Sequence, residues 1–290
     1  MKIWPRCIPC IINARVNEIL RSNIDDNEKI QAIIELLRFI IKEAKPGTST
    51  IYLASEGFRL VKKLTRNIDP YREYKKRSNE LAYELLPDVI KYLERLSGYE
   101  KFRALALITV NANSLDPGVP PFTHEIEELR KTLLQGDFVI DETKKVYSML
   151  DDIDKVAFLL DNAGEAVFDK LLVEELVRYG IEVIVIAKSG TYQNDVTYEE
   201  AIELGFNEIA HVVGTGSDYG GPLPDALSEE AKRVLNSVDL IVAKGMANYE
   251  SFLYSPPPRP VFHLFKAKCV PVASTLNVEK GANIAILRNL

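Results

Sequence analysis

The segment KVAFLLDNAGE, at residues 155–165, contains a strand, a turn and the start of a helix. Val156 to Leu160 form a continuous apolar run, which is typical of a buried parallel strand. Apolar residues then recur with helical spacing between residues 166 and 179. Asp161 and Asn162 therefore follow the carboxyl end of a strand, which is the edge of an open α/β sheet where ligands bind.

The turn after this strand favours a metal site over a dinucleotide site. It lacks the GxGxxG pattern of a dinucleotide-binding loop, whereas carboxylate and amide oxygens suit a divalent cation such as Mg²⁺ or Mn²⁺. The alternative is a helix N-cap, because Asp and Asn both favour that position. A single cap accounts for only one of the residues Asp161 and Asn162, so we favour the metal site.

From Phe138 onwards, predicted strands alternate with predicted helices. Such alternation indicates a parallel, doubly wound sheet that is covered on both faces. We expect strands at residues 155–161, 181–187, 208–213, 239–243 and 261–266, with a further edge strand at 283–288. The connecting helices are expected near residues 166–179, 197–204, 225–236 and 247–254.

Before residue 136 the apolar spacing is almost wholly helical. We therefore predict an α-helical domain at residues 1–136 and an α/β domain, which carries the metal site, at residues 137–290. The segment 99–115 contains ALALITV, which fits a strand or a buried helix, and we choose a helix because the surrounding segments are helical. Helix starts are expected at Asp25 or Asp26, at Asp69 followed by Pro70, and at Thr123, the last for a helix that ends at Gly136.

The composition indicates a globular protein and argues against nucleic-acid-binding, membrane-spanning and secreted proteins. The chain has 290 residues, of which 47% are hydrophobic and 27% charged, as in an ordinary globular protein with a large core. Its net charge of -6 argues against a nucleic-acid binder, because such proteins are usually basic. No apolar run approaches the roughly 20 residues that span a membrane, and MKIWPRCIPC lacks the apolar core of a signal peptide. We expect a cytoplasmic protein that binds neither nucleic acid nor membrane.

Polar residues also follow the other predicted strands. In a parallel sheet these strand ends share one edge, so the acids and amides would form a seat for a metal, and the lysines and helix N-termini a seat for phosphate. Taken singly, Asp195 is explained equally well as a helix cap, and each lysine as a solvated residue. The residues concerned are Lys188, Asn194 and Asp195 after 181–187, Lys244, Asn248 and Glu250 after 239–243, and Lys266 and Lys268 after 261–266.

The cysteines allow more than one interpretation. Cys7 and Cys10 form a CxxC that opens a helix with no preceding strand, unlike the redox motif of thioredoxin-like proteins. Two thiolates do not complete a tetrahedral zinc site, although Cys269 would add a third ligand if segments near the two ends of the chain meet. Burial as small apolar residues explains these cysteines equally well.

Several motifs, in their order along the chain, resemble the damage-control phosphatase family, and in particular its subfamily I, which carries an N-terminal CxxC. The resemblance implies a Rossmann-like α/β domain beside an α-helical domain. It also implies hydrolysis of phosphomonoesters with a divalent metal such as Mn²⁺, Mg²⁺, Ni²⁺ or Co²⁺. The matching segments are CIPC at 7–10, DPYREYKKRSN at 69–79, NSLD at 113–116, DNAGE at 161–165, ND at 194–195, KGMANYE at 244–250 and KAKC at 266–269.

The resemblance also assigns roles to residues. It implies that Asp161, Asn162 and Asp195 hold the metal and that Asn248 and Lys266 contact the substrate, with Lys268 as an alternative to Lys266. We expect Asp161 and Lys266 to be catalytic. The implied substrates are damaged phosphometabolites, such as purine nucleotides or their precursors. The predicted substrate contacts are Asn113, Asp116, Glu165, Lys188, Lys244 and Asn248.

The chemistry leaves alternatives open. Asp161 could instead be a nucleophile, but the DxD arrangement of aspartyl phosphatases is missing because Ala163 stands where the second acid belongs. Glu165 is a candidate general acid or base. A methyltransferase on a Rossmann-like sheet and a non-catalytic nucleotide- or metal-binding protein are the alternative functions, and the missing glycine-rich loop argues against the methyltransferase.

Overall fold

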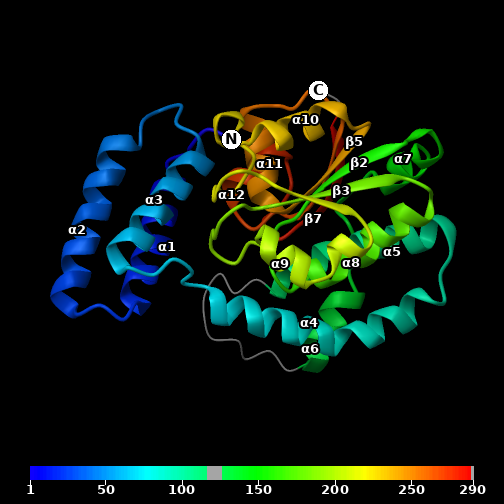
Figure 1. Ribbon diagram of the computed structural model, residues 1–290, viewed down its shortest axis with the longest axis horizontal. Helices are drawn as coiled ribbons and strands as arrows, with labels where there is room; N and C mark the ends of the chain where they lie inside the picture. The colour runs from blue at the N-terminus through cyan, green and yellow to red at the C-terminus, as the bar shows by residue number, and fades with distance from the viewer. Residues whose placement is uncertain (116–125, 289–290) are drawn as a thin grey trace.

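The computed structural model describes residues 1–115 and 126–288. The described residues form a seven-stranded sheet in the order β1-β7-β6-β5-β2-β3-β4 (Figure 1). Neighbouring strands are parallel, except that β6 and β7 are antiparallel. The strands are β1 (Ile140–Asp141), β2 (Lys155–Leu159), β3 (Glu182–Ala187), β4 (His211–Gly214), β5 (Leu240–Lys244), β6 (Val261–Lys266) and β7 (Asn283–Arg288).

Helices precede and connect the strands, which confirms the predicted α/β fold with a mostly parallel sheet and an N-terminal helical region. The N-terminal helical region comprises α1 (Cys7–Arg21), α2 (Asp26–Glu43), α3 (Thr50–Thr65), α4 (Arg72–Leu93) and α5 (Gly98–Asn111). The later helices are α6 (Ile126–Leu134), α7 (Thr143–Tyr147), α8 (Glu165–Arg178), α9 (Tyr198–Glu203), α10 (Glu229–Ser237), α11 (Gly245–Tyr254) and α12 (Val270–Thr275).

The strand at 283–288 is present as β7, but its predicted edge position is wrong. β7 lies between β6 and β1, because β1 pairs with it in parallel through Ile140 and Asp141. β1 has two residues, so it is too short to produce the alternating pattern by which a strand is recognised in a sequence.

The choice of a helix for the segment ALALITV is confirmed by α5. Every residue from Ala104 to Asn111 is buried, because α5 packs against α8 on one side and against β6 and β7 on another. A helix that is covered all round loses its amphipathic pattern. One apolar cluster joins α4 and α5 to β2, β3 and α8 across residue 136. The division into two domains at that residue stays a prediction.

The predicted helix starts have different outcomes. Asp25 caps α2 through a capping box with Glu28, as predicted. The start at Asp69 and Pro70 is wrong, since α4 begins at Arg72. The Asp69 carboxylate instead accepts the Tyr71 N–H at 3.3 Å and pairs with Lys75 Nζ at 3.0 Å. Thr123 lies outside the described residues.

Helices α1, α2 and α3 pack together at one end of the molecule, away from the sheet (Figure 1). Their shared core includes Ile19, Leu36, Leu53 and Val61. Among the described residues, no helix is long and apolar enough to cross a membrane.

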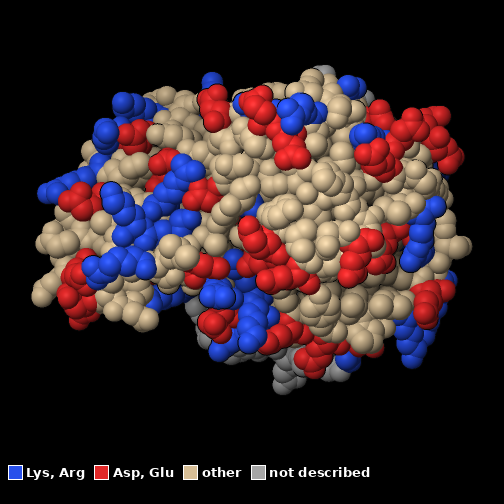
Figure 2. All heavy atoms as spheres, in the orientation of Figure 1, with Lys and Arg blue, Asp and Glu red and all other residues tan. Residues whose placement is uncertain are grey.

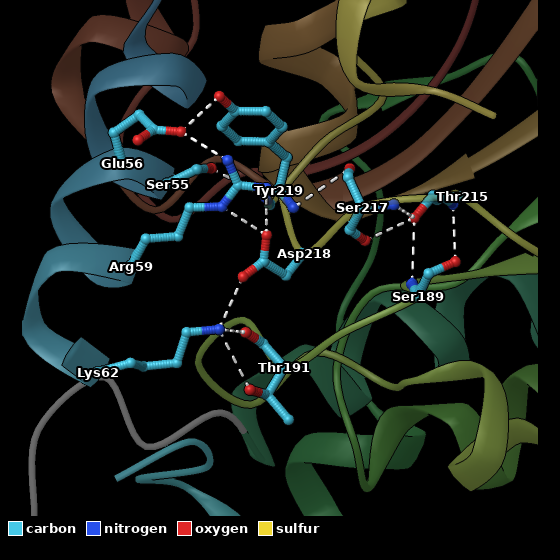
Figure 3. Close-up of polar contacts among 12 residues, drawn as sticks. Ser55, Glu56, Arg59, Lys62, Ser189, Thr191, Thr215, Ser217, Asp218 and Tyr219 are labelled. Carbon is cyan, nitrogen blue, oxygen red and sulfur yellow. Dashed lines mark hydrogen bonds and ion pairs between the residues drawn. The ribbon is translucent and has the colours of Figure 1, made fainter. Parts of the chain in front are cut away.

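Helix α3 is tied to the loops that follow β3 and β4 (Figure 3). Asp218, in the loop after β4, accepts hydrogen bonds from Arg59 Nε at 2.6 Å and from Lys62 Nζ at 2.7 Å. Lys62 Nζ also donates to the main-chain oxygen of Thr191 at 2.7 Å, in the loop after β3. The helical end of the molecule is therefore fixed against the edge of the sheet where the strands end.

Glu250 lies on α11, which packs against α3. The side chain is buried, and its Oε2 atom has no hydrogen-bond partner among the described residues. Burial raises the pKa of Glu250 to about 7, against the opposing effects of the Met1 amino group and Thr50. At neutral pH the folded protein therefore holds Glu250 partly protonated.

We expect Glu250→Gln to stabilise the protein increasingly as the pH rises from 4.5 to above 7. In that interval the folded wild-type protein keeps a proton that the unfolded chain, with the ordinary pKa of 4.5, has released. The contribution of Glu250 to the free energy of unfolding therefore falls with rising pH, by about 3 kcal/mol, and the glutamine variant lacks this loss. Urea unfolding of both proteins near pH 5 and near pH 8 measures the difference, and an equal difference at the two pH values would contradict the prediction.

Candidate active site

The predicted metal ligands gather where β2 and β3 end. These strands are neighbours in the sheet, so the turn after β2 lies beside the loop after β3. Asn162 and Asp195 form an isolated antiparallel bridge, and the Val196 N–H donates to the main-chain oxygen of Asp161 at 2.8 Å. The backbone therefore joins the two segments directly, although they are far apart in the sequence.

None of the predicted metal ligands is a helix cap. α8 follows Gly164, which has a φ of +81°, and no described side chain caps this helix. α9 is capped by Thr197, which shares a capping box with Glu200. The cap interpretation is therefore wrong for both turns, and their acids and amide need another explanation.

Asp161 is buried beside a second acid. Its Oδ2 atom accepts hydrogen bonds from the side-chain amides of Asn162 at 2.6 Å and Asn113 at 3.3 Å. Burial and the neighbouring Glu165 raise the pKa of Asp161 to about 7, against the opposing effect of three nearby lysines. Additional positive charge would favour the charged form of this carboxylate.

Lysines approach the carboxylates from two loops. Lys188, after β3, is buried, and its Nζ lies 3.6 Å from Asp195 Oδ2. Lys268 is one of the cations that lower the pKa of Asp161. Burial and the charge of Lys268 lower the pKa of Lys266, which is half-buried at the end of β6. Which of Lys266 and Lys268 acts beside Asp161 stays a prediction.

Lys244 lies within the protein and is enclosed by acceptors. Its Nζ donates to Glu165 Oε1 at 2.9 Å and to the main-chain oxygen of Thr109 at 3.0 Å, and it lies 2.8 Å from Asp169 Oδ1. Two hydrogen bonds and one ion pair therefore surround this ammonium group. The predicted substrate contact of Lys244 is therefore not supported, and the side chain acts as the counterion of two buried acids.

Asp169 is the residue of this network that sequence analysis missed. It follows Glu165 by one helical turn on the buried face of α8. Burial raises the pKa of Asp169 above its ordinary value, against the attraction of Lys244. Burial also lowers the pKa of Lys244, but Asp169 and Glu165 outweigh that effect and raise it above the ordinary value. The available signal was an acid at an apolar position of the helical pattern.

The first turn of α11 lies directly against Asp161. Gly245 has a φ of +76°, and a Cβ atom added to it would lie 1.9 Å from Asp161 Oδ2. Asn248 donates to the main-chain oxygen of Lys244 at 2.7 Å and to that of Leu160 at 3.3 Å. Its Oδ1 atom is buried and has no hydrogen-bond partner in the described part of the chain. This oxygen is available to a ligand.

The donor set fits a hard divalent cation. Asp161 and Asp195 offer carboxylate oxygens and Asn162 offers an amide oxygen, which are the ligands that such cations prefer. Within residues 1–115 and 126–288, no group of three or more His, Cys, Asp or Glu side chains could hold a metal ion by itself. The predicted metal site would therefore need the amide oxygen of Asn162 as a third ligand.

The remaining predicted residues lie elsewhere. Asp116 is outside the described residues. Cys7 and Cys269 join one apolar cluster with Met1, so segments near both ends of the chain do meet. Burial raises the pKa of Cys7 and raises that of Cys269 to about 11, which opposes the thiolate that a metal needs. The structure favours an apolar packing role for the buried Cys7 and the half-buried Cys269, whereas Cys10 is exposed.

We expect Gly245→Ala to lower the predicted phosphatase activity strongly and to lower the free energy of unfolding by about 1–3 kcal/mol. The reason is that the added methyl group would displace the Asp161 carboxylate. Gly180→Ala is the matched control: Gly180 also has a positive φ, of +86°, but a Cβ atom there would meet nothing within 4 Å. The control should cost only the backbone strain, about 1 kcal/mol, and keep full activity. Equal activity of the two variants would show that the contact between Gly245 and Asp161 does not matter.

Comparison with known proteins places the chain among related sequences and structures. The sequence profile of the damage-control phosphatase ARMT1-like domain matches residues 3–284. Over 99% of its length the chain is 33% identical to an uncharacterized protein of Methanocaldococcus jannaschii, of which it covers 96%. Over 98% of its length it is 32% identical to a damage-control phosphatase of Archaeoglobus fulgidus, of which it covers 99%. The crystal structure of a DUF89 family protein of Pyrococcus horikoshii matches with a TM-score of 0.89, 28% identity and 99% coverage of both chains.

Proposed function

Because the chain belongs to the damage-control phosphatase ARMT1-like family, we propose that it is a phosphatase that depends on a divalent cation held by Asp161, Asn162 and Asp195. The observation that carries this proposal is the backbone bridge between Asn162 and Asp195, which joins two segments of oxygen donors beside the buried Asp161. We further propose that the substrates are phosphomonoesters of small damaged metabolites, such as purine nucleotides or their precursors. The CxxC shared with subfamily I supports this narrower proposal.

Some residues around the proposed metal site would supply positive charge, and others would position the metal ligands. A bound divalent cation would supply Lewis-acid chemistry, by polarising the phosphoryl group and lowering the pKa of a bound water. Lys188 and Lys268 offer positive charge that offsets negative charge developing on the phosphoryl oxygens. Helices α8 and α11 begin just after β2 and β5, and the positive end of each helix dipole favours an anion at this edge of the sheet.

A series of hydrogen bonds from Lys244 through Glu165 positions the Asp161 carboxylate. Lys244 holds Glu165 through Oε1, at 2.9 Å. Glu165 Oε2 in turn accepts hydrogen bonds from Asn113 and from Asn162, at 3.1 Å from the latter. Both amides also donate to Asp161. The enclosure of Glu165 supports a positioning role over its predicted role as general acid or base.

Phosphate release from a panel of phosphorylated metabolites, together with a simple aryl phosphate, tests the proposed function. We expect release with at least one of Mg²⁺, Mn²⁺, Co²⁺ and Ni²⁺, and none after treatment with EDTA. Metal-dependent release would contradict both the methyltransferase and the non-catalytic binding protein. An absence of release from every compound with every metal would contradict the proposed phosphatase.

A further inference from the structure

Helix α2 lies at the outer end of the molecule (Figure 1) and carries a stripe of exposed apolar residues. Ile30, Ile34, Leu37 and Ile41 are all exposed, and Ile41 exposes 81% of its surface. The other face of α2 packs on α1 and α3. Single exposed apolar residues are common on proteins, but a continuous stripe marks an interaction surface. α2 is therefore apolar on two faces, of which the described residues of this chain cover one.

The spacing between the residues of this stripe is the same whether it is read from the N-terminus or from the C-terminus of α2. Its residues are 4, 3 and 4 positions apart, which is the spacing of the apolar seam of a coiled coil. Two copies of α2 in antiparallel orientation would place Ile30 opposite Ile41, and Ile34 opposite Leu37, on both sides of the midpoint. A two-fold interface requires such self-complementarity, because both partners present the same patch.

The charges at the two ends of α2 match the antiparallel orientation. Asp26 lies in the first turn and Lys42 in the last, and their side chains are 97% and 80% exposed. Within the helix Asp26 pairs with Lys29 at 3.7 Å and Lys42 with Glu43 at 3.4 Å. Lys45, which follows the helix, is also exposed. Antiparallel packing brings the acidic start of each helix to the basic end of the other, and it aligns the helix dipoles favourably. Charges of both signs are visible at this end of the molecule in Figure 2.

We propose that a second copy of this chain covers the stripe, through a two-fold symmetric, antiparallel pairing of the α2 helices. The proposal goes beyond the phosphatase function, because no residue of α2 belongs to the candidate active site. One pair of helices forms a small interface, so we expect a dissociation constant of about micromolar order.

Sedimentation equilibrium over a range of concentrations from about 1 to about 200 μM tests the dimer. Ile41→Glu and Ile34→Glu should each weaken it at least tenfold, because each places a charge within the apolar stripe. Ile90→Glu, on α4, is the matched control, because Ile90 is 41% exposed and Ile34 is 36% exposed. The proposal is overturned if the wild type stays monomeric over the whole range, if both α2 variants keep its affinity, or if the control variant dissociates as readily as they do.

Disulfide cross-linking tests the orientation in a Cys10→Ser background, which removes the exposed thiol. A mixture of Ile30→Cys and Ile41→Cys proteins should form a mixed disulfide dimer under mild oxidation. Ile30→Cys alone should not, because the antiparallel arrangement keeps the two copies of residue 30 at opposite ends of the interface. Cross-linking of Ile30→Cys with itself, without the mixed product, would indicate a parallel arrangement and overturn the proposed pairing.

Discussion

Asp161→Asn is expected to lower metal-dependent phosphatase activity by at least about 10³-fold while the protein stays folded. The substitution removes the charge of the central proposed ligand, and with it the electrostatic stabilisation that such sites provide. Folding should survive because burial already raises the pKa of Asp161 to about 7, so the metal-free protein gains little from this charge. Phosphate release at saturating Mn²⁺ measures the first effect, and thermal unfolding in EDTA measures the second.

Asp225→Asn is the matched control, because Asp225 is exposed and lies outside the site. It should keep wild-type activity. Saturating Mn²⁺ should raise the unfolding temperature of the wild type and of this control by a few degrees, since a ligand at about 100 times its dissociation constant adds about 2.7 kcal/mol. Asp161→Asn should show no such rise. Wild-type turnover of Asp161→Asn in saturating Mn²⁺ would mean that the metal seat is misplaced.

Lys244→Met is expected to destabilise the protein by about 3–5 kcal/mol, because it leaves Glu165 and Asp169 buried without their cation. The ammonium lies 2.9 Å from Glu165 Oε1 and 2.8 Å from Asp169 Oδ1, and all three side chains are almost completely buried. Removing one partner of a buried ion pair lowers the free energy of unfolding by more than the intact pair adds to it. The reason is that the remaining charge stays buried without a partner. Urea unfolding followed by circular dichroism measures the loss.

Lys232→Met is the control for the loss of a lysine in an ion pair. Lys232 pairs with Glu229 at 2.8 Å on the surface, and its removal should cost less than about 1 kcal/mol. Adding Asp169→Asn to Lys244→Met should recover part of the stability, because one of the two uncompensated acids is removed. If the double variant has a lower free energy of unfolding than Lys244→Met, the unpaired Asp169 is not the cause of the lost stability.

The candidate site could be predicted in part. The order of the motifs along the chain indicated the family, which the comparisons confirm, whereas the subfamily and the metal ligands stay predictions. Asp161, Asn162 and Asp195 could be proposed together because strand ends of a parallel sheet share one edge. Asp169 was not proposed, because an acid within a helical pattern normally faces solvent and its apolar position was the one sign of its burial. The burial of Lys244 could not be predicted from the sequence either, because its partners Thr109, Glu165 and Asp169 belong to other segments.

The sequence by itself determined the features that depend on neighbours along the chain. Apolar runs and helical spacing identified β2 and α8, and the residues between them revealed oxygen donors at a strand end. Contacts between distant segments were decided only by the tertiary structure. Asn113, 48 residues before Asp161, reaches its carboxylate from the end of the helical region, and β7 lies inside the sheet instead of at its edge. Hydrophobic periodicity records whether a residue is buried, but which partner buries it depends on how the elements pack.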